Sequence, residues 1–285
     1  MKFLIIGPGN MGKRRAAHLR ELGHEVMLMG REAGRVGTWP AVDGTFICTP
    51  PAMHWAYARL SVGLGLPTFI EKPLGLTGET HLWDALLREA QDRNVLVQTG
   101  YTLRHHEAAT DLLSAVLENL PYAFHAVVAH DVAAWYPDYM RNHICLPQAQ
   151  GGGVISELSH ELDLALWLFG PPDRVQCVTG QAGWRNMQAE GMAAITLQWK
   201  GGLVGQIHLD CLSPQYRRHW TLYGDWVREV VFGQQAVSDA LQAETESFCR
   251  VVEGEAIAMP SGEDGLAALR LIKKAQEAEE GVWNF

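Results

Sequence analysis

The chain has 285 residues, a formal net charge of −9 and a pI near 5.7. This length favours two domains, and the acidic balance excludes nucleic acid and anionic membranes as main partners, because the average surface would repel them. The five cysteines are scattered without a CxxC pair and no stretch approaches about 18 uninterrupted apolar residues, so we expect a cytoplasmic protein without disulfides, a zinc site or a membrane span.

The first 119 residues alternate short apolar runs with helical patterns. Strands are predicted at 3–6, 26–29, 46–49, 68–71 and 95–99, and helices at 11–22, 55–62, 80–92 and 108–117. Short runs without polar alternation are typical of parallel strands that are buried on both faces. The alternation predicts an α/β fold with a doubly wound parallel sheet, a Rossmann domain that we assign to residues 1–119.

The pattern changes after Asn119-Leu120-Pro121. Strands are predicted at 123–130, 174–179, 193–199, 203–212 and 220–223, with a hairpin turn at Lys200-Gly201-Gly202. One long helix, about 154–169, interrupts these strands, and a final helix of about 263–280 follows them. We therefore expect residues 120–285 to form an α+β domain with a mostly antiparallel open sheet, which serves substrate binding and oligomerisation.

A glycine-rich loop joins the first predicted strand to the first predicted helix. It consists of Gly7, Pro8, Gly9, Asn10, Met11 and Gly12, a GxGxxG pattern. The first glycine permits the turn, the second admits a pyrophosphate, and the third lets helix and strand pack closely. The helix N-terminus offers unpaired N–H groups to phosphate oxygens. The loop therefore predicts a dinucleotide site, with a tight turn that binds nothing as the alternative.

The end of the second strand predicts which dinucleotide binds. A carboxylate commonly meets the adenosine ribose at this place, but the chain has Gly30 followed by Arg31. The planar guanidinium of Arg31 suits a 2′-phosphate, which favours NADP over NAD. Two alternatives stay open. Glu32 would restore a carboxylate for NAD after a slip of one residue, and Arg31 would otherwise be a solvated loop charge.

Several further motifs follow the glycine loop. The chain carries Glu71-Lys72-Pro73 and the stretches ICTPPAMH (47–54), TGYTLRHH (99–106), GGGVISELSHELDLALWLFG (151–170) and SGEDGLAALRLIKKA (261–275). In this order they make the chain resemble the Gfo/Idh/MocA family of nicotinamide-dependent sugar and polyol oxidoreductases over nearly its whole length. The ELSHELD form of the fourth stretch most resembles the branch associated with nucleotide-sugar and surface-polysaccharide metabolism.

Lys72 is the first candidate catalytic residue. It follows the strand 68–71, at the edge where open α/β sheets bind ligands, and Pro73 restricts its backbone. Like charge and desolvation beside an oxidised nicotinamide favour release of an ammonium proton, which suits proton sharing with a substrate hydroxyl. The resemblance implies this role and a cis Lys72–Pro73 bond, while a surface lysine paired with Glu71 is the alternative. The resemblance also places at the cofactor Thr49, Pro50, His54, Glu71 and Lys72 itself.

His160 is the second candidate. Glu157, His160 and Asp163 step by three along the predicted helix and would share one face. Such a face can hold an imidazole over a substrate while a carboxylate orients it. The resemblance implies that His160 is the general base or its relay, with Glu157 as a candidate orienter and Asp163 near the substrate. Many relatives have an aspartate where this chain has Ser156. The alternative is a capping acid beside a packed histidine, and no metal is expected.

Two other stretches predict substrate contacts. Tyr101 and Arg104 resemble a family stretch that faces the active-site cleft. Trp135 and Tyr139 suit sugar binding by ring stacking and hydroxyl hydrogen bonds, with an ordered surface loop as the alternative. Only fourteen residues separate Gly30 from Thr45, too few for the strand and helix that the family normally has there, which predicts a trimmed adenosine side of the pocket.

The combined expectation is a cytoplasmic NAD(P)-dependent oxidoreductase. It would pass a hydride between nicotinamide and a carbinol or carbonyl carbon of a sugar, nucleotide sugar or cyclic polyol, with His160 taking the hydroxyl proton and Lys72 bonding the same oxygen. We expect a homodimer or homotetramer through the C-terminal sheet. The rival functions are an NAD-dependent glycoside hydrolase of the same fold and a nicotinamide-binding regulatory protein without chemistry.

Overall fold

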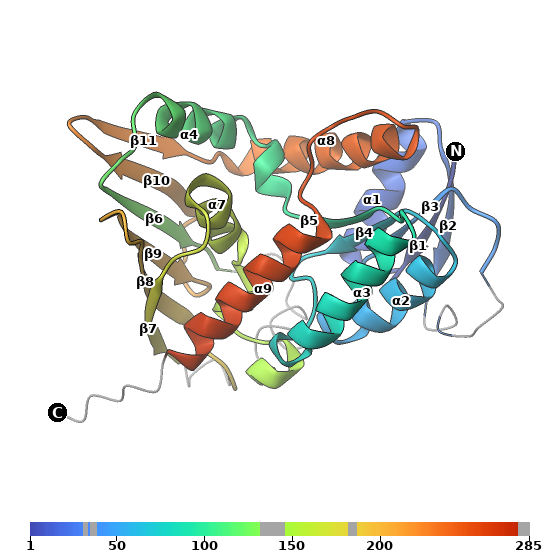
Figure 1. The fold of residues 1–285 in the computed structure, drawn as a ribbon, viewed down its shortest axis with the longest axis horizontal. Helices are drawn as coiled ribbons and strands as arrows, with labels where there is room; N and C mark the ends of the chain where they lie inside the picture. Colours follow the sequence, from blue (N-terminus) through green and yellow to red (C-terminus); the bar gives the residue numbers. More distant parts are fainter. Residues whose placement is uncertain (31–33, 35–38, 132–145, 182–186, 279–285) are drawn as a thin grey trace. The chain divides into compact units, whose positions relative to one another are not determined.

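The structure is a computed structural model that describes residues 1–30, 34, 39–131, 146–181 and 187–278 (Figure 1). The chain forms two compact units, Met1–His105 with Ser238–Leu269 (unit 1) and His106–Val237 with Arg270–Phe285 (unit 2). Ser238–Leu269 thus groups with the N-terminal residues, whereas the sequence analysis assigned it to the second domain. The division of function between 1–119 and 120–285 stays a prediction. No helix in the described ranges is long and apolar enough to cross a membrane.

Unit 1 contains a parallel sheet of five strands in the order β2-β1-β3-β4-β5. The strands are β1 (Lys2–Ile6), β2 (Glu25–Met29), β3 (Gly44–Ile47), β4 (Thr68–Glu71) and β5 (Val97–Gly100). The predicted doubly wound parallel sheet is therefore confirmed. The order changes direction between β1 and β3, and in sheets of this kind ligands bind beyond the carboxyl ends of the strands at that point.

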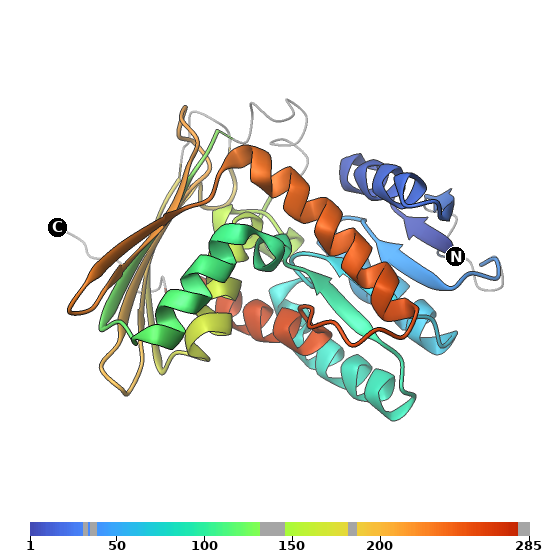
Figure 2. The same ribbon diagram turned by 90° about the horizontal axis from the view of Figure 1, so that it is seen from above.

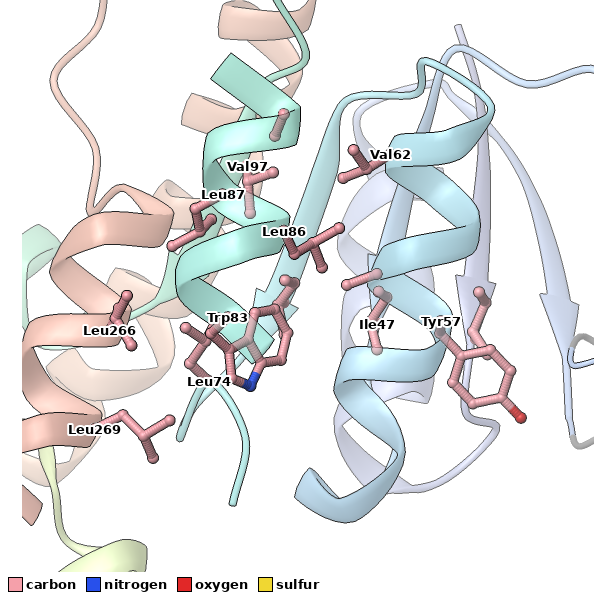
Figure 3. Close-up of a cluster of buried hydrophobic side chains, with 14 of the residues drawn as sticks. Ile47, Tyr57, Val62, Leu74, Trp83, Leu86, Leu87, Val97, Leu266 and Leu269 are labelled. Atoms are coloured by element: carbon pink, nitrogen blue, oxygen red, sulfur yellow. The ribbon is translucent and has the colours of Figure 1, made fainter. Parts of the chain in front are cut away.

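Helices cover both faces of this sheet. They are α1 (Asn10–Glu21), α2 (His54–Gly63), α3 (Thr80–Asp92) and the unit 1 parts of α8 (Gln234–Val252) and α9 (Gly262–Glu277). Unit 1 also has three short 3-10 helices, η2 (Pro51–Met53), η3 (Thr77–Glu79) and η4 (Thr102–His105). On one face, α2 and α3 lie side by side and Trp83 packs in the cluster drawn in Figure 3. On the other face, the Phe248 ring of α8 contacts the rings of Phe3, Phe46 and Phe69. The clusters on the two faces stabilise the parallel sheet, which carries both the glycine loop and the end of β4.

Unit 2 is built on a sheet of six strands in the order β11-β10-β6-β9-β8-β7. Its strands are β6 (Ala123–Ala129), β7 (Arg174–Gly180), β8 (Met192–Gln198), β9 (Val204–Asp210), β10 (Arg217–Tyr223) and β11 (Val227–Val231). Only β6 and β9 pair in parallel, so the predicted mostly antiparallel sheet is confirmed. Gly205 of β9 lies opposite Phe124, where a Cβ would overlap the ring that stacks on Trp220.

One face of this second sheet is covered by helices. The helices of unit 2 are α4 (Glu107–Glu118), α6 (Val154–Glu157) and α7 (His160–Phe169), with η7 (Gln148–Gln150) before α6. Figure 2 shows α4 and α7 against the same face, and the ring of Phe124 in β6 stacks on that of Phe169 in α7. Among the described elements of unit 2, no helix covers the opposite face.

Candidate active site

The glycine loop has the local geometry that a dinucleotide site needs. Gly7 has φ +106°, and a Cβ there would lie 2.5 Å from the carbonyl oxygen of Cys48. A Cβ on Gly12 would overlap the carbonyl oxygen of Gly7, so this glycine lets α1 pack on β1. Gly9 is exposed with open space around its Cβ position, and it precedes α1, whose first turn has no acidic residue. The loop therefore leaves a helix N-terminus open to an anion.

His54 joins the end of β3 to the chain that follows Lys72. Its Nε2 lies 2.7 Å from the carbonyl oxygen of Thr49, and its Nδ1 lies 3.1 Å from that of Pro73 and 3.2 Å from that of Leu74. The ring is fully buried, and this burial lowers the pKa of His54. The cofactor contact assigned to His54 in the sequence stays a prediction, while these contacts give the residue a structural role.

The Glu71-Lys72-Pro73 motif lies at the carboxyl end of β4. Glu71 is the last residue of the strand, and its Oε1 accepts a hydrogen bond of 2.9 Å from Nε of Arg15. The peptide bond between Lys72 and Pro73 is cis, which the resemblance implied. The Lys72 side chain follows directly and is half-buried. The structure therefore places Lys72 at the sheet edge that the sequence predicted.

The stretch from Tyr101 to His105 is tied to the start of α9. Tyr101 is fully buried, and Arg104 makes an ion pair of 3.2 Å with Asp264. Asp264 and Ser261 cap α9 reciprocally, because Asp264 accepts from the Ser261 N–H at 2.8 Å and Ser261 accepts from the Asp264 N–H at 3.1 Å. Burial lowers the pKa of His105 to about 4, with help from Arg15 and Arg104, so its imidazole is uncharged at neutral pH.

In unit 2, the GGG sequence packs against a buried carboxylate. Gly153 has φ +96°, and its Cβ position is occupied by the carboxylate of Glu190. Glu190 accepts hydrogen bonds from the N–H of Ile155 at 3.2 Å and from Nε2 of Gln148 at 2.7 Å. Glu190 thus caps α6 and explains why a residue without a side chain precedes this helix.

The predicted single helix over 154–169 is wrong. Leu158 leaves the helical region with φ −100° and ψ 32°, so α6 ends at Glu157 and α7 begins at His160. The continuous helix face on which Glu157, His160 and Asp163 would step by three is therefore interrupted. Glu157 and His160 are half-buried, while Asp163 is buried within α7.

A buried ion pair fastens the start of α7 to the sheet. Glu161, the neighbour of His160, is fully buried, and its Oε1 lies 2.9 Å from Nε of Arg218 on β10. Tyr216 lies nearby, and burial raises the pKa of its hydroxyl. The His130 ring packs edge-on against Tyr216 at 5.1 Å between ring centroids, and burial lowers the pKa of His130. Tyr216 thus lies close to the pair of Glu161 and Arg218 at the first turn of α7.

The predicted site residues fall into four groups. The structure brings together the glycine loop, Thr49, His54, Glu71 and Lys72 near the carboxyl ends of β1, β3 and β4. Glu157, His160 and Asp163 belong to unit 2, whereas Tyr101 and Arg104 belong to unit 1. Arg31, Trp135 and Tyr139 lie outside the described residues.

Comparison with known proteins shows what the chain resembles. Residues 121–226 match the model of the GFO/IDH/MocA C-terminal domain. The rhizopine catabolism protein MocA of Rhizobium meliloti is 27% identical over 251 residues, which cover 83% of this chain and 75% of that protein. The C-terminal part of the chain, over residues 121–226, is therefore a domain of the GFO/IDH/MocA type. The resemblance predicted from the motifs is thereby confirmed.

Solved structures share the fold of this chain. Scyllo-inositol dehydrogenase from Lactobacillus casei, solved with NAD(H) and scyllo-inositol, superposes with a TM-score of 0.80 at 16% identity and covers 98% of this chain and 97% of its own. UDP-N-acetylglucosamine 3-dehydrogenase from Acidithiobacillus ferrooxidans gives a TM-score of 0.78 at 22% identity, with the same coverages.

The sequence analysis did not single out Arg15, Glu190 or Glu244. A signal exists for two of them, because Arg15 falls four residues before Leu19, and Glu244 four before Phe248, on the apolar stripes of their helices. A charged residue within an apolar stripe indicates a buried, paired charge. Glu190 lies in a connecting segment without periodicity, so no comparable signal marks it.

Proposed function

We propose that this chain is an NAD(P)-dependent oxidoreductase that transfers a hydride between nicotinamide and a carbinol or carbonyl carbon of a sugar, nucleotide sugar or cyclic polyol. The observation that carries the proposal is the position of Lys72, directly after β4 at the carboxyl edge of the parallel sheet, in the same unit as the glycine loop. The substrate class is supported by two proteins of the same fold, which are named as dehydrogenases of scyllo-inositol and of UDP-N-acetylglucosamine.

The residues at this edge fit a nicotinamide dinucleotide. Gly9 leaves open space at the N-terminus of α1, where N–H groups and the helix dipole favour phosphate. The Thr49 hydroxyl has no hydrogen-bond partner within the described part of the chain, and a ligand oxygen would supply one. When bound, the nicotinamide supplies the carbon that accepts or donates the hydride. The proposed contacts are those of the glycine loop from Gly7 to Gly12, Gly30, Thr49 and Pro50.

In this proposal, His160 and Lys72 act on the hydroxyl group of the substrate. His160 takes the proton of the substrate hydroxyl, and Lys72 donates a hydrogen bond to the same oxygen; in the reductive direction both donate. The ion pair of Glu161 with Arg218 supports this role of His160, because it fixes the first turn of α7 to the sheet. Glu157 as the orienting carboxylate has weaker support, since the chain leaves the helix between it and His160.

Turnover on a panel of sugars, nucleotide sugars and cyclic polyols, with NAD and NADP supplied in parallel, tests the proposal. We expect the absorbance of reduced nicotinamide to rise with at least one class of substrate. Release of a sugar from a glycoside without net change in the cofactor would identify a hydrolase instead. Cofactor binding without turnover on any member of the panel would identify a regulatory protein, and either result overturns the proposal.

Arg31 determines the choice between the two cofactors in this proposal. It follows Gly30 after β2, where many dinucleotide domains place a carboxylate. We expect NADPH to bind about tenfold more tightly than NADH, because a guanidinium pairs with the 2′-phosphate, and Arg31→Ala to remove that difference. Fluorescence titration of each reduced cofactor measures the dissociation constants, with Glu32→Gln as the neighbouring control that keeps the preference. Equal or tighter binding of NADH to the wild-type chain would contradict the role of Arg31.

The open face of the six-stranded sheet is proposed to join copies of the chain. Val127 lies at the centre of this face, flanked in register by His208 of β9 and His219 of β10. We expect light scattering to give the mass of a dimer or tetramer, and Val127→Arg to shift it toward the monomer, because a buried unpaired charge opposes association. Leu64→Arg, at a position that is 59% exposed in unit 1, is the control and should leave the mass unchanged. A monomeric wild-type chain would contradict this interface.

A further inference from the structure

Three buried charged side chains meet at the carboxyl end of β4 in unit 1. Arg15 comes from α1, Glu71 ends β4, and Glu244 comes from α8. Arg15 and Glu244 are fully buried, and Glu71 is 7% exposed. The cluster therefore connects the helix that starts at the glycine loop, the strand that ends at Lys72 and a helix from the C-terminal part of the chain.

The guanidinium of Arg15 has an acceptor for each of its nitrogens. Nε donates to Oε1 of Glu71 at 2.9 Å and Nη2 to Oε2 of Glu244 at 2.5 Å, while Nη1 donates to Oγ1 of Thr245 at 2.8 Å and to the carbonyl oxygen of Leu241 at 3.1 Å. A planar fork with five N–H donors can satisfy these directions together. A lysine ammonium is a single point and cannot.

These contacts fix the backbone on one side of Lys72. Glu71, held by Arg15, is its immediate neighbour in the chain. On the other side, the carbonyl oxygens of Pro73 and Leu74 lie against the buried ring of His54. Lys72 is thus bracketed by two buried side chains, which belong to α1 and α2. The backbone that carries the Lys72 side chain is therefore held on both sides.

Stability alone does not account for a charged residue at position 15. Burying charges is costly, and apolar side chains of similar volume often stabilise a protein as well or better. Apolar partners are available, because Cζ of Arg15 lies 4.5 Å from the centroid of the Phe69 ring, which itself packs on Phe248. An apolar residue at this position could not donate the hydrogen bond that holds the carboxylate of Glu71.

We propose that Arg15 is a positioning residue for Lys72. It holds Glu71, and through Glu71 the backbone of Lys72, to the helix that begins at the glycine loop. The inference rests on the proposed catalytic role of Lys72 and adds a residue that touches neither substrate nor cofactor. Loss of the hydrogen bond between Arg15 and Glu71 should therefore lower the rate of the chemical step more than it weakens cofactor binding.

Arg15→Lys tests this role, because it keeps the positive charge between the two carboxylates and removes only the planar guanidinium with its separate N–H donors. Arg20→Lys, the same substitution at an exposed position of α1, is the matched control. Glu71→Gln keeps an oxygen for Arg15 and removes the charge. The double variant of Arg15→Lys with Glu71→Gln closes a double-mutant cycle, which isolates the coupling between the two residues.

Three measurements on the full chain test the positioning role. NADH fluorescence titration gives the cofactor dissociation constant, and turnover of the best panel substrate gives kcat. Trace acetylation with acetic anhydride, read by mass spectrometry, compares the reactivity of the Lys72 amine with that of exposed Lys13 in the same molecule. For Arg15→Lys we expect a dissociation constant within about threefold of wild type, kcat at least about tenfold lower, and a changed ratio of Lys72 to Lys13 labelling. The double variant should be no slower than the slower single variant.

The outcomes separate this inference from the proposed function. If the wild-type chain turns over no substrate, the proposed function fails, while the labelling ratio still decides whether Arg15 positions Lys72. If Arg15→Lys matches Arg20→Lys in kcat and in labelling ratio, the positioning role is overturned. A fall in thermal stability with unchanged kcat and labelling would assign Arg15 to folding alone and also overturns it.

Discussion

Lys72→Ala is expected to lower kcat by about 10² to 10⁴ fold, the range over which a positioned proton-transfer group accelerates a reaction. Lys72 is half-buried and follows β4 directly, so the substitution removes the proposed hydrogen bond to the reacting oxygen without opening a core. Cofactor binding should change little, because the glycine loop stays intact. Turnover of the best panel substrate and NADH titration measure the two effects separately.

The control for this prediction is Lys200→Ala, which removes a lysine whose side chain is 89% exposed in the hairpin between β8 and β9. It should retain the wild-type kcat. Lys72→Arg keeps the charge but cannot release a proton, so its kcat should also fall. Wild-type rates in both Lys72 variants would remove Lys72 from the mechanism.

His160→Ala belongs to the same prediction and should lower kcat by a comparable factor. His81→Ala, at an exposed position of α3, is its control. The double variant of Lys72→Ala with His160→Ala should be little slower than the slower single variant, because residues that act on one proton transfer as a unit are not additive. Additive losses would indicate that the two residues act in separate steps.

The fold of unit 1 could be predicted in part from local signals. Apolar runs, the GxGxxG loop and the helical stripes gave the five strands and α1, α2 and α3, and all are confirmed. Helix α8 was missed, because Glu244 and Thr245 lie on its buried face and interrupt the apolar stripe. Polar residues that form buried hydrogen bonds thus interrupt the apolar periodicity from which a helix is predicted.

The break between α6 and α7 could not be predicted either. Leu158 and Ser159 separate the two helices, and neither is a glycine or proline that marks a helix end. The buried pair of Glu161 with Arg218 lies directly after the break, on the first turn of α7. The break between α6 and α7 therefore coincides with a contact to the sheet. The partner in this contact is distant in the sequence, so the residues around the break do not reveal it.

The candidate site, too, depends on contacts between residues that are far apart in the sequence. Lys72 and His160 could be proposed from the sequence because they belong to motifs with local spacing. Arg15 was missed because its partners Glu71 and Glu244 lie 56 and 229 positions away in the chain. Tertiary folding creates these pairs, so no short window of sequence contains both members.

Glu244 should make the stability of the chain fall as the pH rises. Its side chain is fully buried, and burial raises the pKa of Glu244 from 4.5 to about 7, although Arg15 opposes the shift. Between these values the folded state binds more protons than the unfolded state, so the free energy of unfolding decreases with increasing pH. The contribution is fully present below pH 4.5 and is lost as the pH rises through about 7. The loss amounts to at most about 3 kcal/mol.

Glu244→Gln should flatten this decline. The glutamine keeps one oxygen as acceptor for Arg15 and Thr102, and its amide takes the place of Oε1, which has no hydrogen-bond partner in the described part of the chain. Urea unfolding of both proteins at intervals from about pH 5 to about pH 8 gives a difference curve. Buried histidines such as His54, whose lowered pKa acts in the opposite direction, cancel in that difference. Parallel curves would mean that Glu244 is ionised throughout, with Arg15 outweighing the effect of burial.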